Sequence, residues 1–383
     1  MRNLHYIGLT LLTSILFSCN NNGENAQTMA LLSENNALTF TEVMLNASID
    51  KDIVDILHSE AVNSSSNGLD ESIYLTEILS ENNSQTKSSD SRDFLKSFFT
   101  ENCAQHMTKS MNNELCDINN IEIYWPYCEH WDGYSQPVIV INKYDDSQFI
   151  EDDKVYAYRI TESNGSYIVD SLIVDEAYAM KNPVWVINNC SLSIDDILSI
   201  KNNYTATTIN PTSKSSYVCE TEVVTFKATE QHDVWINGGS EFEIHWLFPK
   251  PDNTIATNKS GLITFTREQI NNKTTKTVNF IGNLDWNASQ YCNRMVVVEV
   301  DESALKEIEL SVPIKISETI TITPTAKITL NKLDDSIMDY NIYRYAMFTV
   351  ETKIDDTHYQ KSFSGGGATA VVSIRSIETL PGI

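Results

Sequence analysis

The stretch that decides the fold reads Glu241-Phe242-Glu243-Ile244-His245-Trp246-Leu247-Phe248. Every second side chain in it is large and apolar, and those between are mostly charged or polar. A period of two is typical of a strand with one face in a core and the other in water, as in antiparallel sandwiches. The stretch therefore predicts a strand of an antiparallel sheet, with His245 on the wet face.

The same period continues on both sides of this strand, over residues 217–383. Further strands are expected at 222–228, 234–236, 262–266, 277–281, 294–300, 307–316, 319–323, 327–330, 342–351 and 369–374. Asn237-Gly238-Gly239 is a strong turn signal between two of these strands. We therefore predict that the C-terminal domain is an antiparallel β-sandwich of at least about eight strands.

Cys219, Trp235 and Cys292 follow one another as the cysteines and the tryptophan of an immunoglobulin domain do. In that pattern a tyrosine lies two residues before the second cysteine, whereas Tyr291 directly precedes Cys292. The sequence resembles the pattern without fulfilling it. An immunoglobulin-like sandwich and a C2-like or other sandwich therefore both remain open.

A different pattern precedes the sandwich. Apolar side chains recur every three or four residues over 38–117, which predicts a helical region in which Asp50 and Asp70 cap helices. The period then changes to two, which predicts a small β domain over 118–190. A polar linker at 191–216 joins it to the sandwich. The expected fold is mainly β with an α-helical N-terminal segment.

Residues 7–17 form an apolar run that leads into Leu16-Phe17-Ser18-Cys19. The run has the length of a secretory signal peptide and is too short to span a membrane. Its end resembles a lipobox, the motif at which a bacterial lipoprotein is cleaved and its cysteine acylated. We therefore expect a signal peptide over 1–18, lipidation of Cys19 and a flexible tether over 19–37. The acyl chains would hold the protein on a lipid bilayer.

The chain of 383 residues carries a formal net charge of −25 at pH 7. A surface of this sign repels phosphate backbones, so nucleic acid is not an expected partner. The sequence contains no P-loop, no H-E-x-x-H and no G-x-S-x-G motif, and we predict no cofactor. These observations leave binding proteins and hydrolases of other kinds open.

Seven cysteines are present, and six remain after Cys19. An even number permits disulfides in an exported protein. Neighbourhood in the sequence favours the pairs Cys103–Cys116, Cys128–Cys190 and Cys219–Cys292. Buried unpaired cysteines are the alternative, because a free thiol packs as a small apolar group.

Cys128-Glu129-His130-Trp131-Asp132 is the stretch richest in reactive side chains. Cys128 and His130 would share one face of a strand, where an imidazole base can activate a thiol. They are the candidate catalytic pair of a hydrolase, although no known catalytic motif surrounds them. The alternative is a disulfide-bonded cysteine in an aromatic loop.

Carboxylates crowd one loop between predicted strands, namely Asp145, Asp146, Glu151, Asp152 and Asp153. Calcium takes six to eight oxygen ligands, of which such a loop can supply several, but the spacing fits no EF-hand. We predict no metal site and keep Asp145, Asp146, Asp152 and Asp153 as the calcium candidates. Solvated loop charges are the alternative.

Four aromatic residues gather around one loop, namely Trp125, Tyr127, Trp131 and Tyr134. Aromatic faces stack on sugars, so an exposed cluster of this kind would make a glycan-binding platform. Packing inside the small β domain is the alternative.

The order of the parts is similar to that in a group of uncharacterised lipoproteins of Bacteroidota. The likeness is carried by the lipobox, the helical segment, the strand Ile121-Glu122-Ile123-Tyr124-Trp125-Pro126, the run 182–188 and the terminal sandwich. It implies an outer-membrane lipoprotein, facing the periplasm or the cell exterior, and no catalytic residues. We expect a membrane-anchored, non-catalytic binding protein for a protein or glycan ligand. A hydrolase with a site near Cys128–Asp132 is the alternative.

Overall fold

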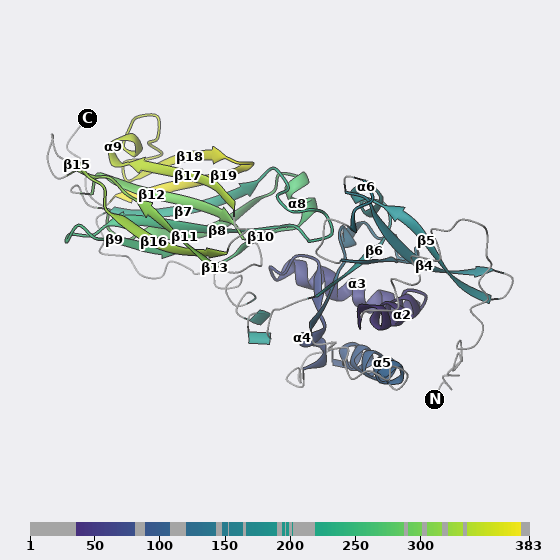
Figure 1. Ribbon diagram of the computed structural model, residues 1–383. Coiled ribbons are helices and arrows are strands. Elements are labelled where there is room, and N and C mark those ends of the chain that lie inside the picture. Colours follow the sequence, from purple (N-terminus) through teal and green to yellow (C-terminus); the bar gives the residue numbers. More distant parts are fainter. Residues whose placement is uncertain are drawn as a thin grey trace.

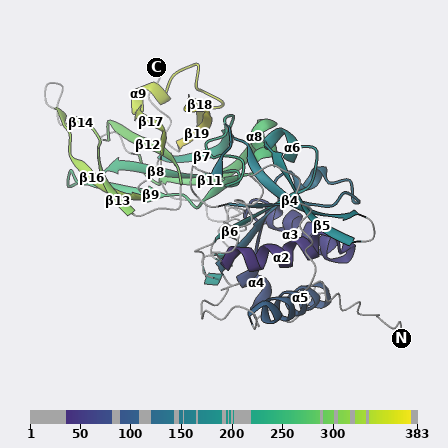
Figure 2. The ribbon, with the colours of Figure 1, turned by 45° about the vertical axis from the view of Figure 1, so that its right-hand side comes forward.

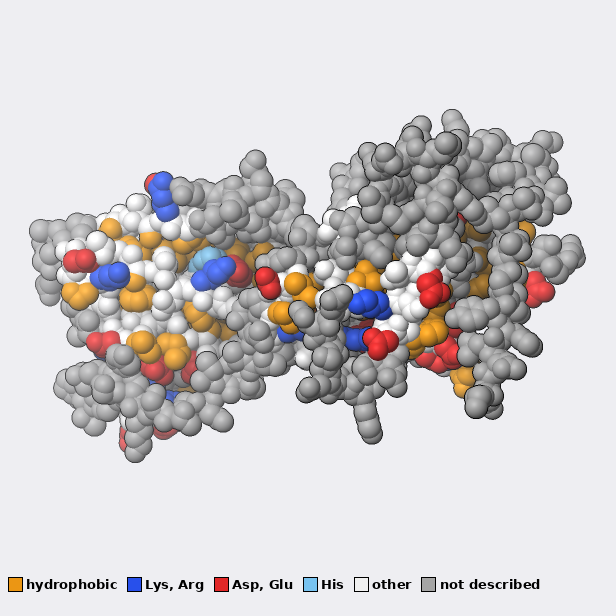
Figure 3. Space-filling model, turned by 90° about the horizontal axis from the view of Figure 1, so that it is seen from below, with side chains coloured by type: hydrophobic (Ala, Val, Ile, Leu, Met, Phe, Trp, Pro, Cys, Tyr) orange, Lys and Arg blue, Asp and Glu red, His pale blue; other side chains and the backbone are white. Residues whose placement is uncertain are grey.

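Two lobes lie side by side in the computed structural model, an N-terminal α/β lobe and a C-terminal β-sandwich (Figures 1 and 2). The structure describes residues 36–80, 89–107, 120–142, 148–151, 153–163, 166–189, 194–195, 197–198, 201, 219–286, 290–300, 305–315, 321–331 and 335–376. Seen from below, the lobes meet at a narrower waist (Figure 3). Within these residues, every helix is too short or too polar to cross a membrane. The chain is mainly β with a helical N-terminal segment, as predicted.

The N-terminal lobe opens with four helices, α2 (Asn36–Ser48), α3 (Lys51–Ser66), α4 (Leu75–Leu79) and α5 (Ser89–Met107). Asp50 caps α3, because its carboxylate accepts hydrogen bonds from the backbone amides of Asp52 and Ile53. The helix expected after Asp70 begins later than predicted. Strand β1 (Ser72–Tyr74) stands there instead, because pairing with β2 (Ile121–Tyr124) overrides the local helical period.

Six strands form the sheet of this lobe, in the spatial order β1, β2, β6, β3, β4, β5. The further bounds are β3 (Val138–Ile141), β4 (Val155–Ser163), β5 (Ser166–Val174) and β6 (Val184–Asn189), with the short helices η2 (Cys128–His130) and α6 (Glu176–Ala179). Strands β3 and β6 are parallel and the other pairs are antiparallel.

Helices α2, α3 and α5 share one apolar cluster with the sheet, in which Phe40, Leu57, Phe99, Trp125 and Trp185 are fully buried. The regions predicted separately at 38–117 and 118–190 therefore have a common core and form one domain.

The sandwich has two antiparallel sheets, in the orders β10, β8, β12, β17 (with β9 also paired to β8) and β11, β7, β19, β18. The strands are β7 (Cys219–Ala228), β8 (Ser240–Pro249), β9 (Ile255–Lys259), β10 (Ile263–Phe265), β11 (Thr275–Asn283), β12 (Cys292–Glu299), β17 (Asp335–Tyr343), β18 (His358–Gly365) and β19 (Ala368–Ser376). Phe242, Ile244 and Trp246 of β8 lie in the core between the sheets, so the alternation in this strand has the predicted meaning.

The outer face of β8 and β12 is covered by a ribbon of β13 (Leu305–Ser311) and β16 (Thr325–Asn331), with β14 (Ile314–Lys315) and β15 (Thr321–Ile322) in the loop between them. Leu310 and Ile328 of the ribbon pack on Leu247 and Val296. His245 lies on this covered face and is buried, so the prediction that it faces water is wrong.

The predicted strand at 234–236 does not form. The loop between β7 and β8 turns toward the N-terminal lobe, where Trp235 and Ile236 join Tyr124 and Val138 in the apolar cluster on the second face of that sheet. Trp235 therefore lies outside the sandwich core, which rules out the immunoglobulin pattern of a tryptophan packed on core cysteines. The strand predicted over 342–351 is also wrong, because β17 ends at Tyr343 and helix α9 (Arg344–Met347) follows.

Candidate functional site

The thiol of Cys128 is buried and is not paired with the imidazole of His130. Cys128 packs in the apolar cluster beneath α2 and α3. Burial, and then the charges of Glu71 and Glu129, raise the pKa of this thiol far above its ordinary value. The His130 ring lies at the surface, with Nδ1 at 3.1 Å from the carbonyl oxygen of Met180. A nucleophilic thiol needs a low pKa and a base within reach, so the structure does not support the alternative in which Cys128 and His130 form a catalytic pair.

The predicted disulfides are wrong for the three cysteines whose side chains the structure describes. Cys128, Cys219 and Cys292 are buried thiols. Cys219 of β7 faces the core between the two sheets, whereas Cys292 of β12 faces the covering ribbon on the other side of its sheet. A sheet therefore separates the two sulfur atoms, and no bond can join them. The structure does not describe Cys19, Cys116, Cys190 or the side chain of Cys103.

The predicted aromatic platform is not exposed. Trp125 and Tyr127 are buried, and Trp131 is half-buried with its ring centroid 5.4 Å from that of Trp125. Tyr134 is 86% exposed and is the one member of the four that offers a free ring face. Trp125, Tyr127 and Trp131 thus pack inside the lobe.

Of the four calcium candidates, Asp145, Asp146 and Asp152 lie outside the described residues. Asp153 is half-buried, and its backbone carbonyl accepts a hydrogen bond of 2.8 Å from the indole of Trp235. The described part of this loop therefore helps to join the two lobes.

The junction between the lobes holds a set of buried charges that the sequence did not reveal. Arg267 begins α8 (Arg267–Asn271) and is 3% exposed. Its Nε donates to Glu176 of α6 at 2.5 Å, and its Nη1 donates to the carbonyl oxygens of Asp233 and Gly238, each at 3.0 Å. Tyr127 donates to the same carboxylate at 2.6 Å. Burial alone raises the pKa of Glu176, but the hydrogen bonds from Arg267 and Tyr127 outweigh it and lower that pKa.

The loop between β7 and β8 completes the junction. The amide of Asn142 donates to Asn237 at 2.9 Å, and the backbone N–H of Gly239 donates to the carboxylate of Asp70 at 2.7 Å. A Cβ atom on Gly239 would lie 1.8 Å from the carbonyl oxygen of Phe265. Gly239 and Phe265 both belong to the sandwich, so glycine is required here for the loop to pack against the end of β10.

Beside Asp70 lies Glu71, which is fully buried. Burial, and then the neighbouring Asp70, raise the pKa of Glu71 well above its ordinary value. The same causes, burial first, raise the pKa of the buried Tyr124 hydroxyl, and burial lowers the pKa of the nearby Lys276 to about 8. Burial thus shifts the pKa values of Glu71, Tyr124 and Lys276 in the direction of their neutral forms.

At the rim of the junction, one imidazole and two carboxylates converge. They belong to Glu129 and His130 of η2 and to Glu268 of α8, and one ligand-type atom of each lies within 4.8 Å of the others. The His130 Nε2 atom is 3.5 Å from the Glu268 carboxylate. Two of these residues belong to the N-terminal lobe and one to the sandwich.

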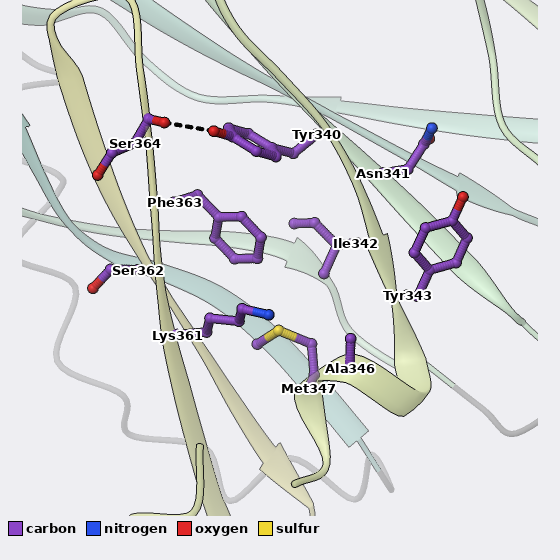
Figure 4. A pocket seen from close by; sticks show the side chains of 10 residues that line it. All are labelled: Tyr340, Asn341, Ile342, Tyr343, Ala346, Met347, Lys361, Ser362, Phe363 and Ser364. Atoms are coloured by element: carbon purple, nitrogen blue, oxygen red, sulfur yellow. Dashed lines mark hydrogen bonds between the residues drawn. The ribbon is translucent and has the colours of Figure 1, made fainter. Parts of the chain in front are cut away.

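A second candidate site lies at the end of the sandwich away from the N-terminal lobe (Figure 1). A hollow of about 340 Å³ opens there between β17, α9 and β18. Figure 4 shows Ile342 and Phe363 facing one another across it, with Tyr340 donating a hydrogen bond to the backbone carbonyl of Ser364. A hollow of about 560 Å³ adjoins it and is lined by Tyr345, Ala346, Thr349, Glu351, Thr352, Gln360, Lys361 and Ser362.

Three tyrosines pack against one another beside these hollows, and the rings of Tyr291 and Tyr345 are also in contact, with centroids 6.1 Å apart. The rings of Tyr343 and Tyr345 are stacked, with centroids 5.7 Å apart and planes inclined by 26°, and Tyr291 lies 5.3 Å from Tyr343. Tyr345 is the outermost and is 65% exposed. We name Tyr291, Tyr343 and Tyr345 the tyrosine row. The spacing in Tyr340-Asn341-Ile342-Tyr343-Arg344-Tyr345 is its signal in the sequence, but the strand predicted over 342–351 obscured it.

Comparison with known proteins adds little. No family model and no curated protein matches this chain. Among solved structures, a chain of CC2D1B, described as coordinating ESRCT-III activity during the mitotic reformation of the nuclear envelope, is similar over 48% of this chain and 73% of its own length. The identity is 11% and the TM-score is 0.25, values too low to support any argument about function.

Proposed function

We propose that this protein is a non-catalytic binding protein, anchored to the outer membrane through acylated Cys19, whose glycan ligand docks at the tyrosine row. One observation carries the proposal: Tyr345 presents an exposed ring, held by stacking on Tyr343, at the rim of a hollow. Binding sites combine such apolar faces with a few polar groups that fix orientation. Gln360, Lys361 and Ser362 supply those groups along the same hollow.

The geometry suits an anchored receptor. The hollows lie at the end of the sandwich that is farthest from the N-terminal lobe (Figure 1). The described chain begins with α2 in the N-terminal lobe, so an anchor at Cys19 would be joined to that lobe and not to the end of the sandwich that carries the tyrosine row. The lipobox-like Leu16-Phe17-Ser18-Cys19 supports the anchor.

A glycan fits this site better than a protein partner does. The tyrosine row offers one narrow aromatic face with hydroxyl and amide groups around it, which matches a sugar ring bearing polar substituents. Protein interfaces need a larger contiguous surface, about 800 Å² for each partner. A catalytic thiol is not part of the proposal, because Cys128 is buried with a raised pKa.

The test is a screen of the full chain, purified in detergent, on a glycan array, followed by titration of the best glycan. Tyr345→Ala is expected to weaken binding about tenfold, which corresponds to about 1.4 kcal/mol. Tyr134→Ala is the matched control, because it removes an exposed tyrosine from the N-terminal lobe, and this tyrosine is even more accessible than Tyr345. Equal losses in both variants, or selective capture of a protein instead of any glycan, would overturn the proposal.

A further inference from the structure

We propose that Glu129, His130 and Glu268 bind a zinc ion that bridges the two lobes. These side chains carry one imidazole nitrogen and two carboxylates, and their ligand atoms lie within 4.8 Å of one another. Zinc binds such nitrogen and oxygen donors at about 2.0–2.2 Å, so the three side chains would have to close slightly around one ion. The inference is independent of the tyrosine row.

The imidazole of His130 is oriented as a metal ligand. Its Nδ1 lies 3.1 Å from the carbonyl oxygen of Met180, to which it can only donate. In the neutral ring this hydrogen bond places the lone pair on Nε2, the atom that faces Glu268 at 3.5 Å. A histidine that ligates a metal almost always donates its other ring N–H to a carbonyl or carboxylate in this way.

Neighbouring side chains hold the ligands in place. The ring of Tyr127 stacks on the His130 imidazole, with centroids 5.8 Å apart and planes inclined by 24°. Tyr127 is itself fixed by its hydrogen bonds to Glu176 and Asn271. On the other lobe, Asn272 donates to Oε1 of Glu268 at 2.6 Å and leaves Oε2 turned toward His130. Two of the three ligands, His130 and Glu268, are therefore held in place before an ion binds.

The donor set selects the metal. Calcium and magnesium prefer oxygen ligands only, whereas imidazole suits zinc and its first-row neighbours. Two carboxylates and a neutral imidazole also carry two negative charges, which a divalent ion balances. The three protein ligands leave one position of a tetrahedral zinc ion for water. Because η2 and α8 belong to different lobes, the bound ion would lock the junction.

The experiment is isothermal titration calorimetry of zinc into the metal-free full chain in detergent. Melting curves of the zinc-loaded chain are then recorded before and after EDTA treatment. Wild type is expected to bind one zinc ion with a melting temperature that falls on EDTA treatment. His130→Ala and Glu268→Gln, one from each lobe, are each expected to weaken zinc binding by at least about tenfold and to abolish the EDTA effect. Calcium is expected to give no comparable heat.

His358→Ala is the matched control, because this histidine also lies beside a carboxylate, with Nδ1 at 2.8 Å from Asp355. It is expected to leave zinc binding unchanged. A zinc affinity that is the same in wild type, His130→Ala and Glu268→Gln would show adventitious binding elsewhere and would overturn the proposal. Loss in His130→Ala without loss in Glu268→Gln would refute a bridge between the lobes.

Discussion

Tyr127 at the junction and Tyr345 beside the distal hollow each follow a strand in aromatic-rich sequence, yet their surroundings are opposite. Tyr127 is buried, and its hydroxyl joins Glu176 and Asn271 across the two lobes. Tyr345 is largely exposed and touches other tyrosine rings on one side alone. The difference arises because the sandwich covers Tyr127, whereas no described element covers Tyr345. An aromatic cluster in a sequence thus predicts a binding platform only when nothing packs over it.

The charged residues of the two regions differ in the same way. Glu71 at the junction is fully buried with a raised pKa, whereas Glu351 lines the distal hollow and is exposed. The junction therefore keeps its polar groups away from water, and the distal end leaves them available for a ligand. Three pairs of substitutions test this contrast.

The largest effect is expected from Trp235→Ala. Trp235 fills the apolar cluster of the N-terminal lobe and donates to the carbonyl of Asp153, so its removal should lower the free energy of unfolding by about 3–5 kcal/mol. Tyr345→Ala should change it by less than about 0.5 kcal/mol. Urea denaturation of both variants measures the difference. Similar losses from the two substitutions would contradict the contrast.

Arg267→Met is expected to cost about 3 kcal/mol, because it removes the positive charge that neutralises Glu176 and the donor to two backbone carbonyls at the junction. Arg344→Met at the distal end removes one hydrogen bond to the carbonyl of Trp286 and should cost about 1 kcal/mol. Thermal melting at several salt concentrations provides the measurement. The idea fails if both arginines prove equally dispensable.

Glu71→Gln is expected to stabilise the protein at neutral pH, by less than Trp235→Ala or Arg267→Met destabilises it. The folded-state pKa of Glu71 is raised, so the unfolded chain loses this proton at lower pH than the folded chain does. Stability from Glu71 is therefore present below its unfolded pKa and declines as the pH rises above it. The glutamine variant should lose that decline, whereas Glu351→Gln should retain it. The measurement is the urea midpoint of each variant between pH 4 and 8. The same dependence of the midpoint on pH in wild type and Glu71→Gln would contradict the prediction.

The sandwich could be predicted because its strands carry their own signal. The alternation in β8 reports directly which side chains face the core, and the Asp50 cap of α3 needs no distant residue. Prediction failed where a distant segment decided the outcome. Strand β1 depends on pairing with β2. Residues 234–236 do not form a strand of the sandwich, because Trp235 packs in the core of the other lobe.

The candidate sites were missed for the same reason. Arg267, Glu176, Asp70 and Tyr127 come from four separate segments, and no spacing in the sequence relates them. The Cys128–Asp132 stretch looked reactive because its residue types are adjacent, but the thiol turns inward while the imidazole turns outward. An even number of cysteines likewise says nothing about which side of a sheet each sulfur faces.

The placement of Trp235 also constrains the order in which the chain can mature. A polypeptide is synthesised from its N-terminus, and domains generally fold as units in that order. Here the second face of the first sheet stays uncovered after β6 has emerged, because Trp235 and Ile236 arrive later from the loop between β7 and β8. The N-terminal lobe must therefore persist for a time with an open apolar face. Its final closure depends on the loop between β7 and β8, so the N-terminal lobe does not complete its maturation alone.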